Sequence, residues 1–293
     1  MGYQLWTSPV TGYRRRGTRL VELHAVLGSQ ITARAIFEPL QSCPADAPAR
    51  EMSRALKQRD FDVAGVRIER DGPVIGFVER KRLKNKTIRD HIAPLTEDDW
   101  MEESLPLASL IQRLKQREFV FVRLEANAAG IITQADLNKP PVRVYLFGLI
   151  SLLEMHLSYW VKAEFPENAW RKAIKPERLK KAEEHQGECH RRKHELELVD
   201  CLQFCDKRDL LVGRESVRSA LCLGSKGEAT TRLHQAEDLR NILAHSHYDL
   251  IGGTSWGDLF RLVEWMEAVI QASDRCVEQR AQQGAQVDFT GLW

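Results

Sequence analysis

Hydrophobic and polar positions in the first half of the chain follow one pattern twice. Residues 56–63 read LKQRDFDV and residues 114–121 read LKQREFVF. Each copy comes after apolar residues at helical spacing and leads into two short β-type runs. These runs cover residues 63–68 and 74–78 in the first copy, and residues 119–124 and 130–133 in the second. The pattern predicts helix, strand, strand and helix in each copy, and units this small should pack on each other.

Beyond residue 139 the β-type runs stop and helical spacing takes over. Lys139-Pro140-Pro141 marks the change, and we expect the two prolines to stop a helix and stiffen the junction. The following segments predict a bundle of antiparallel helices. They are residues 142–163, 177–188, 193–207, 214–223, 228–244 and 255–280. The predicted division is an extension over residues 1–30, an α/β pair over 31–139 and an all-α domain over 140–293.

Composition agrees with a globular protein. The chain has 293 residues, of which 43% are apolar and 29% charged, and its formal net charge of +2 excludes a histone-like basic coat. The most apolar segment, residues 142–161, contains Glu154 and His156, so it predicts a buried helix and not a membrane span. The N-terminus lacks the apolar core of a secretory signal, so we expect a cytoplasmic protein.

The N-terminal segment combines a basic run with a short helical pattern. Arg14, Arg15 and Arg16 are followed by leucines and a valine at helical spacing. We expect a helix here that packs on the repeat pair, and RNA contact by the arginines is the alternative.

Six scattered cysteines indicate reduced thiols in a cytosolic protein. A local cluster nevertheless raises the question of zinc; it consists of Cys189, His190, His194, Cys201 and Cys205. Structural zinc sites usually have closer ligand pairs, such as a CxxC knuckle, which this cluster lacks. We therefore predict no metal site.

The end of the second copy carries a compact motif, Gly130-Ile131-Ile132-Thr133-Gln134-Ala135-Asp136. With the tandem repeat over roughly residues 30–138, this motif resembles the CBS-domain family, whose repeats pair and often bind adenosine-type nucleotides. The resemblance implies that Gly130 lets the strand approach a ligand, that Thr133 holds a phosphate and that Asp136 accepts bonds from a ribose diol. The alternative is structural: Thr133 caps a helix and Asp136 interacts with its first turn.

The first copy departs from that motif. Glu79 stands where Thr is expected, and Arg82 stands where Asp is expected. A carboxylate at position 79 would repel phosphate, so the first cleft should be empty or bind a different ligand.

The helix predicted over residues 228–244 ends in Arg240-Asn241-Ile242-Leu243-Ala244-His245. Arg-Asn, three residues and His resembles the motif of the HEPN superfamily, which is all-helical, usually dimeric and often a metal-independent endoribonuclease. The resemblance covers roughly residues 142–280 and assigns catalysis to Arg240, Asn241 and His245. His245 can act as general base or acid, Arg240 can stabilise charge on phosphate, and Asn241 shares the helix face of His245.

Two neighbouring features have weaker roles. Ser246 and His247 support the motif at most, and Glu154, alone on its apolar helix, is expected to pair with Arg240.

Together the two resemblances predict an α/β tandem CBS pair of βαββα repeats, fused to an all-α HEPN-like bundle. The corresponding function is a homodimeric, metal-independent endoribonuclease that AMP, ADP, ATP or a related nucleotide regulates through the CBS pair. The analogy is to ligand-controlled ribonucleases in prokaryotic stress or phage defence. The main alternative is a non-catalytic adenine-nucleotide sensor or adaptor that dimerises through its helical half. A further alternative is a protein that works with a nucleotidyltransferase partner.

Overall fold

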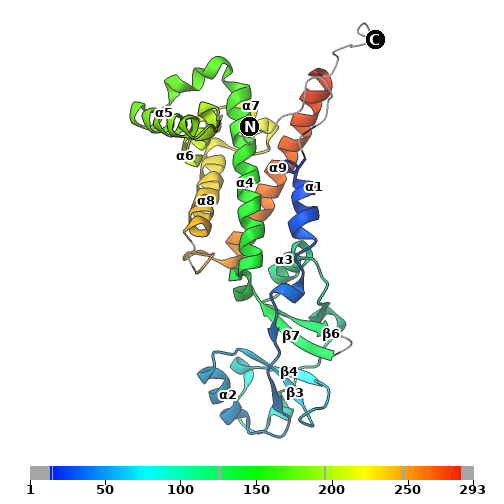
Figure 1. Cartoon of the computed structure of the whole chain (residues 1–293). Helices are drawn as coiled ribbons and strands as arrows, with labels where there is room; N and C mark the ends of the chain where they lie inside the picture. Colours follow the sequence, from blue (N-terminus) through cyan, green and yellow to red (C-terminus); the bar gives the residue numbers. More distant parts are fainter. Residues whose placement is uncertain (1–13, 15, 125–126, 195, 246–247, 285–293) are drawn as a thin grey trace, which may run out of the picture. The chain divides into compact units, whose positions relative to one another are not determined.

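The computed structural model describes residue 14 and residues 16–124, 127–194, 196–245 and 248–284 (Figure 1). The chain divides into two compact units. One unit is Gly28–Val142, and the other joins Met1–Leu27 to Arg143–Trp293. The N-terminal segment thus belongs to the helical unit, where we expected a separate extension.

The unit Gly28–Val142 contains the predicted repeat. Its first copy is β2 (Ser42–Pro44), α2 (Ala49–Gln58), β3 (Val63–Arg67) and β4 (Gly76–Glu79). The second copy is β5 (Trp100–Glu102), α3 (Leu107–Gln116), β6 (Phe119–Leu124) and β7 (Asn127–Thr133). In both copies the first two strands pair in parallel across the helix, and the last two pair antiparallel. The two copies of the sequence repeat therefore have the same order and pairing of strands and helix.

The two copies form separate sheets that meet through aromatic side chains. One sheet has the order β2-β3-β4, and the other has the order β1-β7-β6-β5, with β1 at Glu38–Pro39. The ring of Phe77 on β4 lies 5.7 Å from that of Phe119 and 5.2 Å from that of Phe121, both on β6. Such ring pairs add to the stabilisation from apolar burial. The copies thus pack on each other, as their small size predicted.

The helix expected at the end of each copy is only a short 3₁₀ turn. These turns are η3 (Arg80–Arg82) and η6 (Gln134–Asn138). In the second copy the cause is Pro140, because proline disfavours helical backbone in the residue before it, and Lys139 has ψ of 149°. Pro140 is also the first residue of α4 (Pro140–Glu164). The prolines therefore start α4, in addition to ending the 3₁₀ turn before it.

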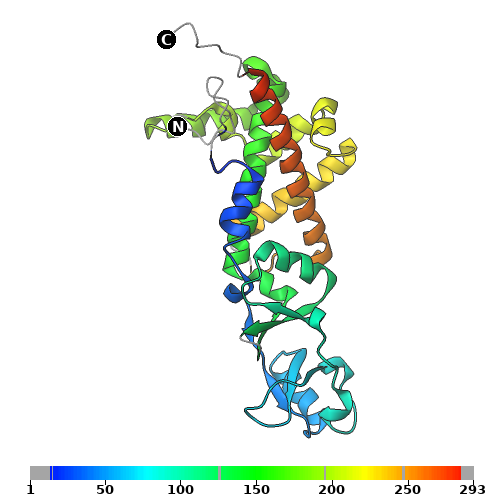
Figure 2. The same ribbon diagram turned by 90° about the vertical axis from the view of Figure 1, so that its right-hand side faces the viewer.

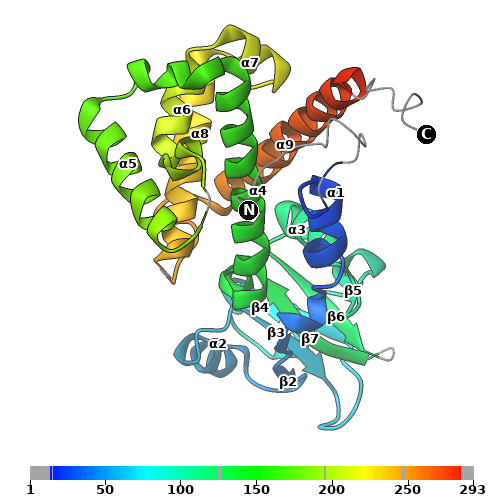
Figure 3. The same cartoon turned by 45° about the horizontal axis from the view of Figure 1, so that its top comes forward.

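The second unit is helical (Figures 1 and 3). After α4 come α5 (Pro176–Arg191), α6 (Phe204–Val212), α7 (Glu215–Ala220), α8 (Lys226–Ala244) and α9 (Trp256–Gly284). The prediction of one helix over residues 193–207 was wrong. A 3₁₀ turn, η8 (Leu198–Cys201), stands there instead, and the backbone N–H of Gln203 donates to Asp206 Oδ2 where α6 begins. This cap starts a new helix and does not extend an old one.

Helix α4 has the length and apolar composition of a membrane span, but 61% of its most apolar window is buried inside the structure. The core helix of a soluble domain has the same properties. Figures 1 and 2 show α9 running beside it. Trp160 of α4 donates its indole N–H to Ser273 Oγ of α9 at 2.7 Å, and His156 Nδ1 lies 2.6 Å from the same oxygen.

A buried polar cluster surrounds Ser273. Burial lowers the pKa of His156 to about 3, so its ring is neutral and its Nδ1 accepts a hydrogen bond from the Ser273 hydroxyl. The Ser273 side chain is 0% exposed, and Asp274 Oδ1 lies 3.4 Å from His156 Nε2. Serine, histidine and aspartate side by side suggest a catalytic triad, but no substrate reaches a fully buried hydroxyl. The cluster therefore holds α4 against α9.

The short helix α1 (Leu20–Leu23) also packs on α9. The backbone N–H of Leu20 donates to Asp274 Oδ2 at 3.0 Å, and Arg14 Nη1 lies 2.5 Å from Asp274 Oδ1. This arrangement corrects the expectation that the N-terminal helix packs on the repeat pair. The side chain of Arg14 is buried in this ion pair, which provides an intramolecular role for one of the arginines considered for RNA contact.

Candidate functional site

The residues predicted to bind nucleotide lie at the end of the second copy, on β7 and η6. A Cβ atom at Gly130 would lie 2.2 Å from a ring carbon of Phe37 and 2.8 Å from the carbonyl oxygen of Glu38. Gly130 pairs with Pro39 across β1 and β7, so only glycine leaves room for the neighbouring strand. The close approach that we assigned to a ligand is made by the chain itself.

The matching glycine of the first copy has the same role. A Cβ atom at Gly76 would lie 2.4 Å from Ile92 Cγ2 and 2.6 Å from the carbonyl oxygen of Ala93. Each copy thus places a glycine where another segment of the unit crosses its last strand. The glycine of the motif has a packing reason that is independent of any ligand.

Thr133 and Asp136 contact each other directly. Asp136 Oδ2 accepts hydrogen bonds from the backbone N–H of Thr133 at 2.7 Å and from its hydroxyl at 3.0 Å. The other oxygen lies 2.9 Å from Lys139 Nζ, and the Asp136 side chain is only 11% exposed. Burial lowers the pKa of Lys139, but hydrogen bonds to Glu38 and Asp136 outweigh burial and raise it above its usual value. The capping alternative therefore describes the observed contacts of Thr133 and Asp136.

In the first copy, the corresponding position carries a local ion-pair cluster. Glu79 lies 2.9 Å from both Lys81 Nζ and Arg82 Nε. These basic side chains neutralise the carboxylate of their own copy.

The predicted catalytic motif occupies the last turn of α8. Arg240 Nη1 donates a hydrogen bond to Asn241 Oδ1 at 3.2 Å. His245 follows one turn later as the C-terminal cap, where its backbone N–H donates to the carbonyl oxygen of Asn241 at 3.0 Å and its side chain is exposed. The helix thus brings the three residues to one exposed end. Ser246 and His247 lie outside the described residues.

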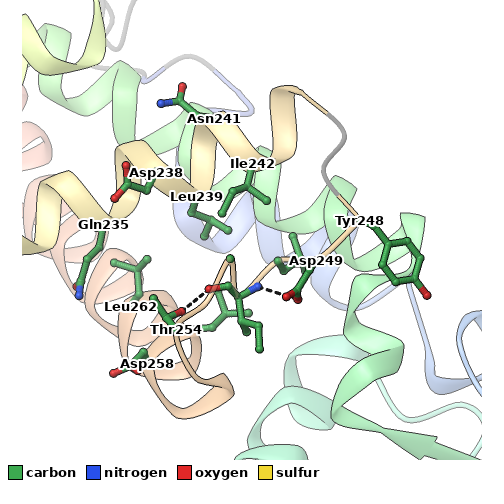
Figure 4. A pocket seen from close by; sticks show the side chains of 14 residues that line it. Gln235, Asp238, Leu239, Asn241, Ile242, Tyr248, Asp249, Thr254, Asp258 and Leu262 are labelled. Atoms are coloured by element: carbon green, nitrogen blue, oxygen red, sulfur yellow. Dashed lines mark hydrogen bonds between the residues drawn. The ribbon is translucent and has the colours of Figure 1, made fainter. Parts of the chain in front are cut away.

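Arg240 and Asn241 line two different cavities. Asn241 lines a cavity of about 600 Å³ between α8, the following loop and α9 (Figure 4). Arg240 lines a polar cavity of about 500 Å³ that also contains Lys181, His185 and Asp200. Burial raises the pKa of Asp200. Sequence reasoning missed the cations of α5 in this second cavity, although Arg178, Lys181 and His185 recur every three or four residues on one helix face.

Glu154 has a different partner from the one expected. Its Oε1 accepts a hydrogen bond from Lys207 Nζ at 2.9 Å, and the Lys207 side chain is 3% exposed. A buried ammonium needs a compensating carboxylate, whereas Arg240 is exposed and can be solvated. This need explains why Glu154 pairs with Lys207 and not with Arg240.

The cysteines near α5 and α6 are poor zinc ligands. Burial raises the pKa of Cys201 to about 11 and raises that of Cys205. Zinc binds the thiolate, so protonated, buried thiols disfavour such a site. Cys189 Sγ lies 3.8 Å from His185 Nε2, within one turn of α5.

No family model matches the chain, and no curated protein matches it. Solved structures do show a partial likeness. The CBS domain of a bacterial CNNM/CorC family Mg²⁺ transporter in complex with ATP is 18% identical, with a TM-score of 0.34, over 41% of this chain and 93% of that chain. CBS domains of a transcriptional regulator from Streptococcus pneumoniae are 18% identical, with a TM-score of 0.31, over 36% of this chain and 96% of that chain.

A CBS domain pair in complex with 5′-methylthioadenosine and S-adenosyl-L-methionine is a third similar structure. It is 14% identical, with a TM-score of 0.32, and the match covers 36% of this chain and 92% of that chain. These similar structures are CBS domains and extend over about two fifths of the chain. The resemblance of the helical unit to the HEPN superfamily stays a prediction.

Proposed function

We propose that the chain is a metal-independent endoribonuclease that acts as a homodimer and is regulated by an adenine nucleotide. The catalytic part of this proposal rests on the arrangement of residues in the last turn of α8. There Arg240 is hydrogen-bonded to Asn241, and His245 lies one turn further at the exposed helix end. A cation and an imidazole at this spacing suit a phosphodiester, because one can bind the phosphate while the other transfers protons.

The reaction that suits these groups is attack by a ribose 2′-hydroxyl on the adjacent phosphate. His245 takes the hydroxyl proton, the new P–O bond closes a 2′,3′-cyclic phosphate, and the bond to the 5′-oxygen breaks. A protonated histidine of the second copy gives its proton to the departing 5′-oxygen. Arg240 stabilises the charge on the non-bridging oxygens, and Asn241 holds its guanidinium in place. None of these roles requires a metal.

The second copy would bind along the N-terminal half of α4. Val144 and Phe147 are 54% and 48% exposed there, one turn apart on a helix that is otherwise largely buried. A two-fold axis through such an apolar patch buries it against its own copy. The same contact would supply the second histidine that the reaction needs.

Regulation would act through η6. For a ribose to bind Asp136, the carboxylate must exchange Lys139 for the ribose hydroxyls, while Thr133 binds a phosphate. Lys139 directly precedes α4, the helix that carries Val144 and Phe147. Release of Lys139 would therefore change the start of the helix that forms the proposed dimer contact.

The test is cleavage of single-stranded RNA in excess EDTA. We expect 2′,3′-cyclic phosphate products and no cleavage of the same sequence as DNA, which lacks the nucleophile. His245→Ala and Arg240→Ala should each lower the rate about a hundredfold or more, as loss of an acid–base group does. His234→Ala is the matched control, since His234 is an exposed histidine of the same helix that pairs with Asp238. Activity that requires a metal, or that persists in His245→Ala, would refute the proposal.

A non-catalytic sensor or adaptor is the second candidate. The exposed patch at Val144 and Phe147 favours it to the same degree, because a partner protein can cover an apolar patch as well as a second copy can. A nucleotidyltransferase is one partner of this kind. Nucleotide binding without RNA cleavage in any assay would support this candidate.

A further inference from the structure

The cavity beside α8 has no role in the cleavage chemistry proposed above. Its volume of about 600 Å³ lies within the range of small-molecule sites. The lining comes from the C-terminal half of α8, the loop over residues 248–254 and the start of α9 (Figure 4). Asn241 is among its described lining residues, whereas Arg240 and His245 are not. The cavity thus borders the proposed catalytic turn on one side.

The interior of the cavity is apolar. Buried leucines from both helices and the loop form much of it; they are Leu239, Leu250, Leu259 and Leu262. Ile242 lies beside Leu239 in Figure 4. A surface of this kind suits an uncharged, apolar group and gives no stabilisation to a phosphate.

The charged part of the lining is acidic. Asp238, Asp249 and Asp258 contribute carboxylates, and none of the described lining residues is Lys or Arg. Carboxylates only accept hydrogen bonds when ionised, and they repel phosphate. The preferred occupant is therefore an uncharged, largely apolar group that carries N–H donors.

Two of the three carboxylates already have side-chain partners. Asp258 accepts hydrogen bonds from Ser255 and from Arg261, at the start of α9. Asp238 lies 2.9 Å from the ring nitrogen of His234, one turn earlier on α8. Both carboxylates thus have roles within their own helices.

Asp249 differs because its observed partner is a backbone group. Its Oδ1 accepts a hydrogen bond from the N–H of Ile251 at 3.2 Å, and among the described residues no partner contacts Oδ2. This bond orients the carboxylate, and Figure 4 shows it in the loop beside the apolar lining. An ionised carboxylate has about four acceptor positions, so both oxygens can still accept hydrogen bonds.

We propose that this cavity binds a guanine base of the RNA substrate, with Asp249 accepting hydrogen bonds from the guanine N1–H and 2-amino group. Guanine is the RNA base whose Watson–Crick edge presents two adjacent N–H donors, and proteins read unstacked RNA bases on that edge. The inference rests on the proposed function, because it places the guanine next to the cleaved phosphate. Asn241 connects the two sites, since it lines the cavity and hydrogen-bonds Arg240.

The first test compares cleavage beside guanine with cleavage beside inosine, which keeps N1–H and lacks the 2-amino group. For the full-length protein we expect kcat/KM to fall about 10- to 100-fold with inosine, the loss typical of a hydrogen bond to a charged group. Asp249→Asn should lower cleavage beside guanine and bring the guanine-to-inosine ratio close to one. Asparagine keeps the acceptor for Ile251 N–H, so the loop should fold. Asp46→Asn is the matched control, because Asp46 is an exposed aspartate that pairs with Arg89 and does not line the cavity, and its ratio should match that of the unaltered protein.

The second test is independent of cleavage and separates this inference from the proposed function. Saturation-transfer NMR with guanosine, inosine, adenosine and N-acetylarginine amide measures which of them contacts the protein. Guanosine contact that Asp249→Asn abolishes supports the base site, even if no RNA is cleaved. Equal signals for all nucleosides, contact by the arginine compound alone, or a guanine-to-inosine ratio unchanged in Asp249→Asn would each overturn it.

Discussion

Asp136 and Lys139 form an ion pair of 2.9 Å across the single 3₁₀ turn that leads from the repeat pair into α4. The same carboxylate caps that turn through Thr133. One side chain therefore holds the end of the predicted nucleotide motif and the residue before the first proline of the helical segment. A ligand that competes with Thr133 and Lys139 for this carboxylate would therefore affect both the motif and the start of the helical segment.

Removing the charge of Asp136 is the first test of that idea. Asp136→Asn should weaken binding of AMP, ADP or ATP by about 1–3 kcal/mol, the range for hydrogen bonds to a charged group. Isothermal titration calorimetry measures the change. Asp90→Asn is the control, because Asp90 caps its own 3₁₀ turn through Thr87 and is not part of the motif. Equal losses in both variants, or no binding to the unaltered protein, would count against a nucleotide site at Asp136.

Gly130 should tolerate no side chain. The Cβ of Gly130→Ala would meet Phe37 at 2.2 Å and the carbonyl oxygen of Glu38 at 2.8 Å. We expect the free energy of unfolding to fall by about 1–3 kcal/mol, which is typical of overpacking. Gly187→Ala is the control, since the nearest neighbouring atom, a terminal nitrogen of Arg191, lies 3.9 Å away. That change should be neutral or stabilise helix α5 by up to about 1 kcal/mol, and urea unfolding compares the two.

Local pattern was sufficient to predict the first helix and the last two strands of each copy. LKQRDFDV and LKQREFVF each cross from a helix into a strand, as α2 to β3 and α3 to β6, because periodicity changes within a few residues there. The break before Phe204 was missed, since it depends on a cap at Gln203 inside an apolar stretch. Pattern alone did not predict that the last helix of each copy is a single 3₁₀ turn.

The sequence did not show which side chains contact one another across the fold. Glu154 was correctly seen as a carboxylate that needs a cation, but Lys207 and Arg240 are both basic, and only packing decides which one is buried. The motif at Arg240 was visible because its residues lie within six consecutive positions of the sequence. The cavity at Asp249 was not, because its walls come from α8, a loop and α9.

Acid should destabilise the helical unit through His156. Burial holds its folded pKa at about 3, whereas an unfolded histidine titrates near 6.5. The folded state therefore binds fewer protons between these values. The contribution to stability is complete above pH 6.5 and is lost as pH falls toward 3, by up to about 1.4 kcal/mol for each pH unit.

Urea unfolding at pH 7, 6 and 5 measures this dependence. His156→Gln removes the titrating group and should flatten the curve in that range, at the expense of lower stability at pH 7. His234→Gln is the control, because His234 is exposed and lies in the same unit. A slope that remains in His156→Gln would assign the acid sensitivity to another group.

Phe147 provides the sharpest test of the proposed dimer. Its side chain is 48% exposed on α4, one turn from Val144. Phe147→Asp puts a charge into a patch that a second copy would cover, and burying an unpaired charge is costly, so the variant should be monomeric in light scattering. If the second histidine comes from the partner copy, the rate of RNA cleavage by the monomer should fall about a hundredfold or more, as it does on loss of an acid–base group, while nucleotide binding is kept.

Ile68→Asp is the control, because Ile68 is exposed to a similar extent in the repeat unit and its substitution should leave assembly unchanged. A Phe147→Asp variant that remains dimeric would place the interface elsewhere, and one that is monomeric yet fully active would show that a single copy contains the complete site.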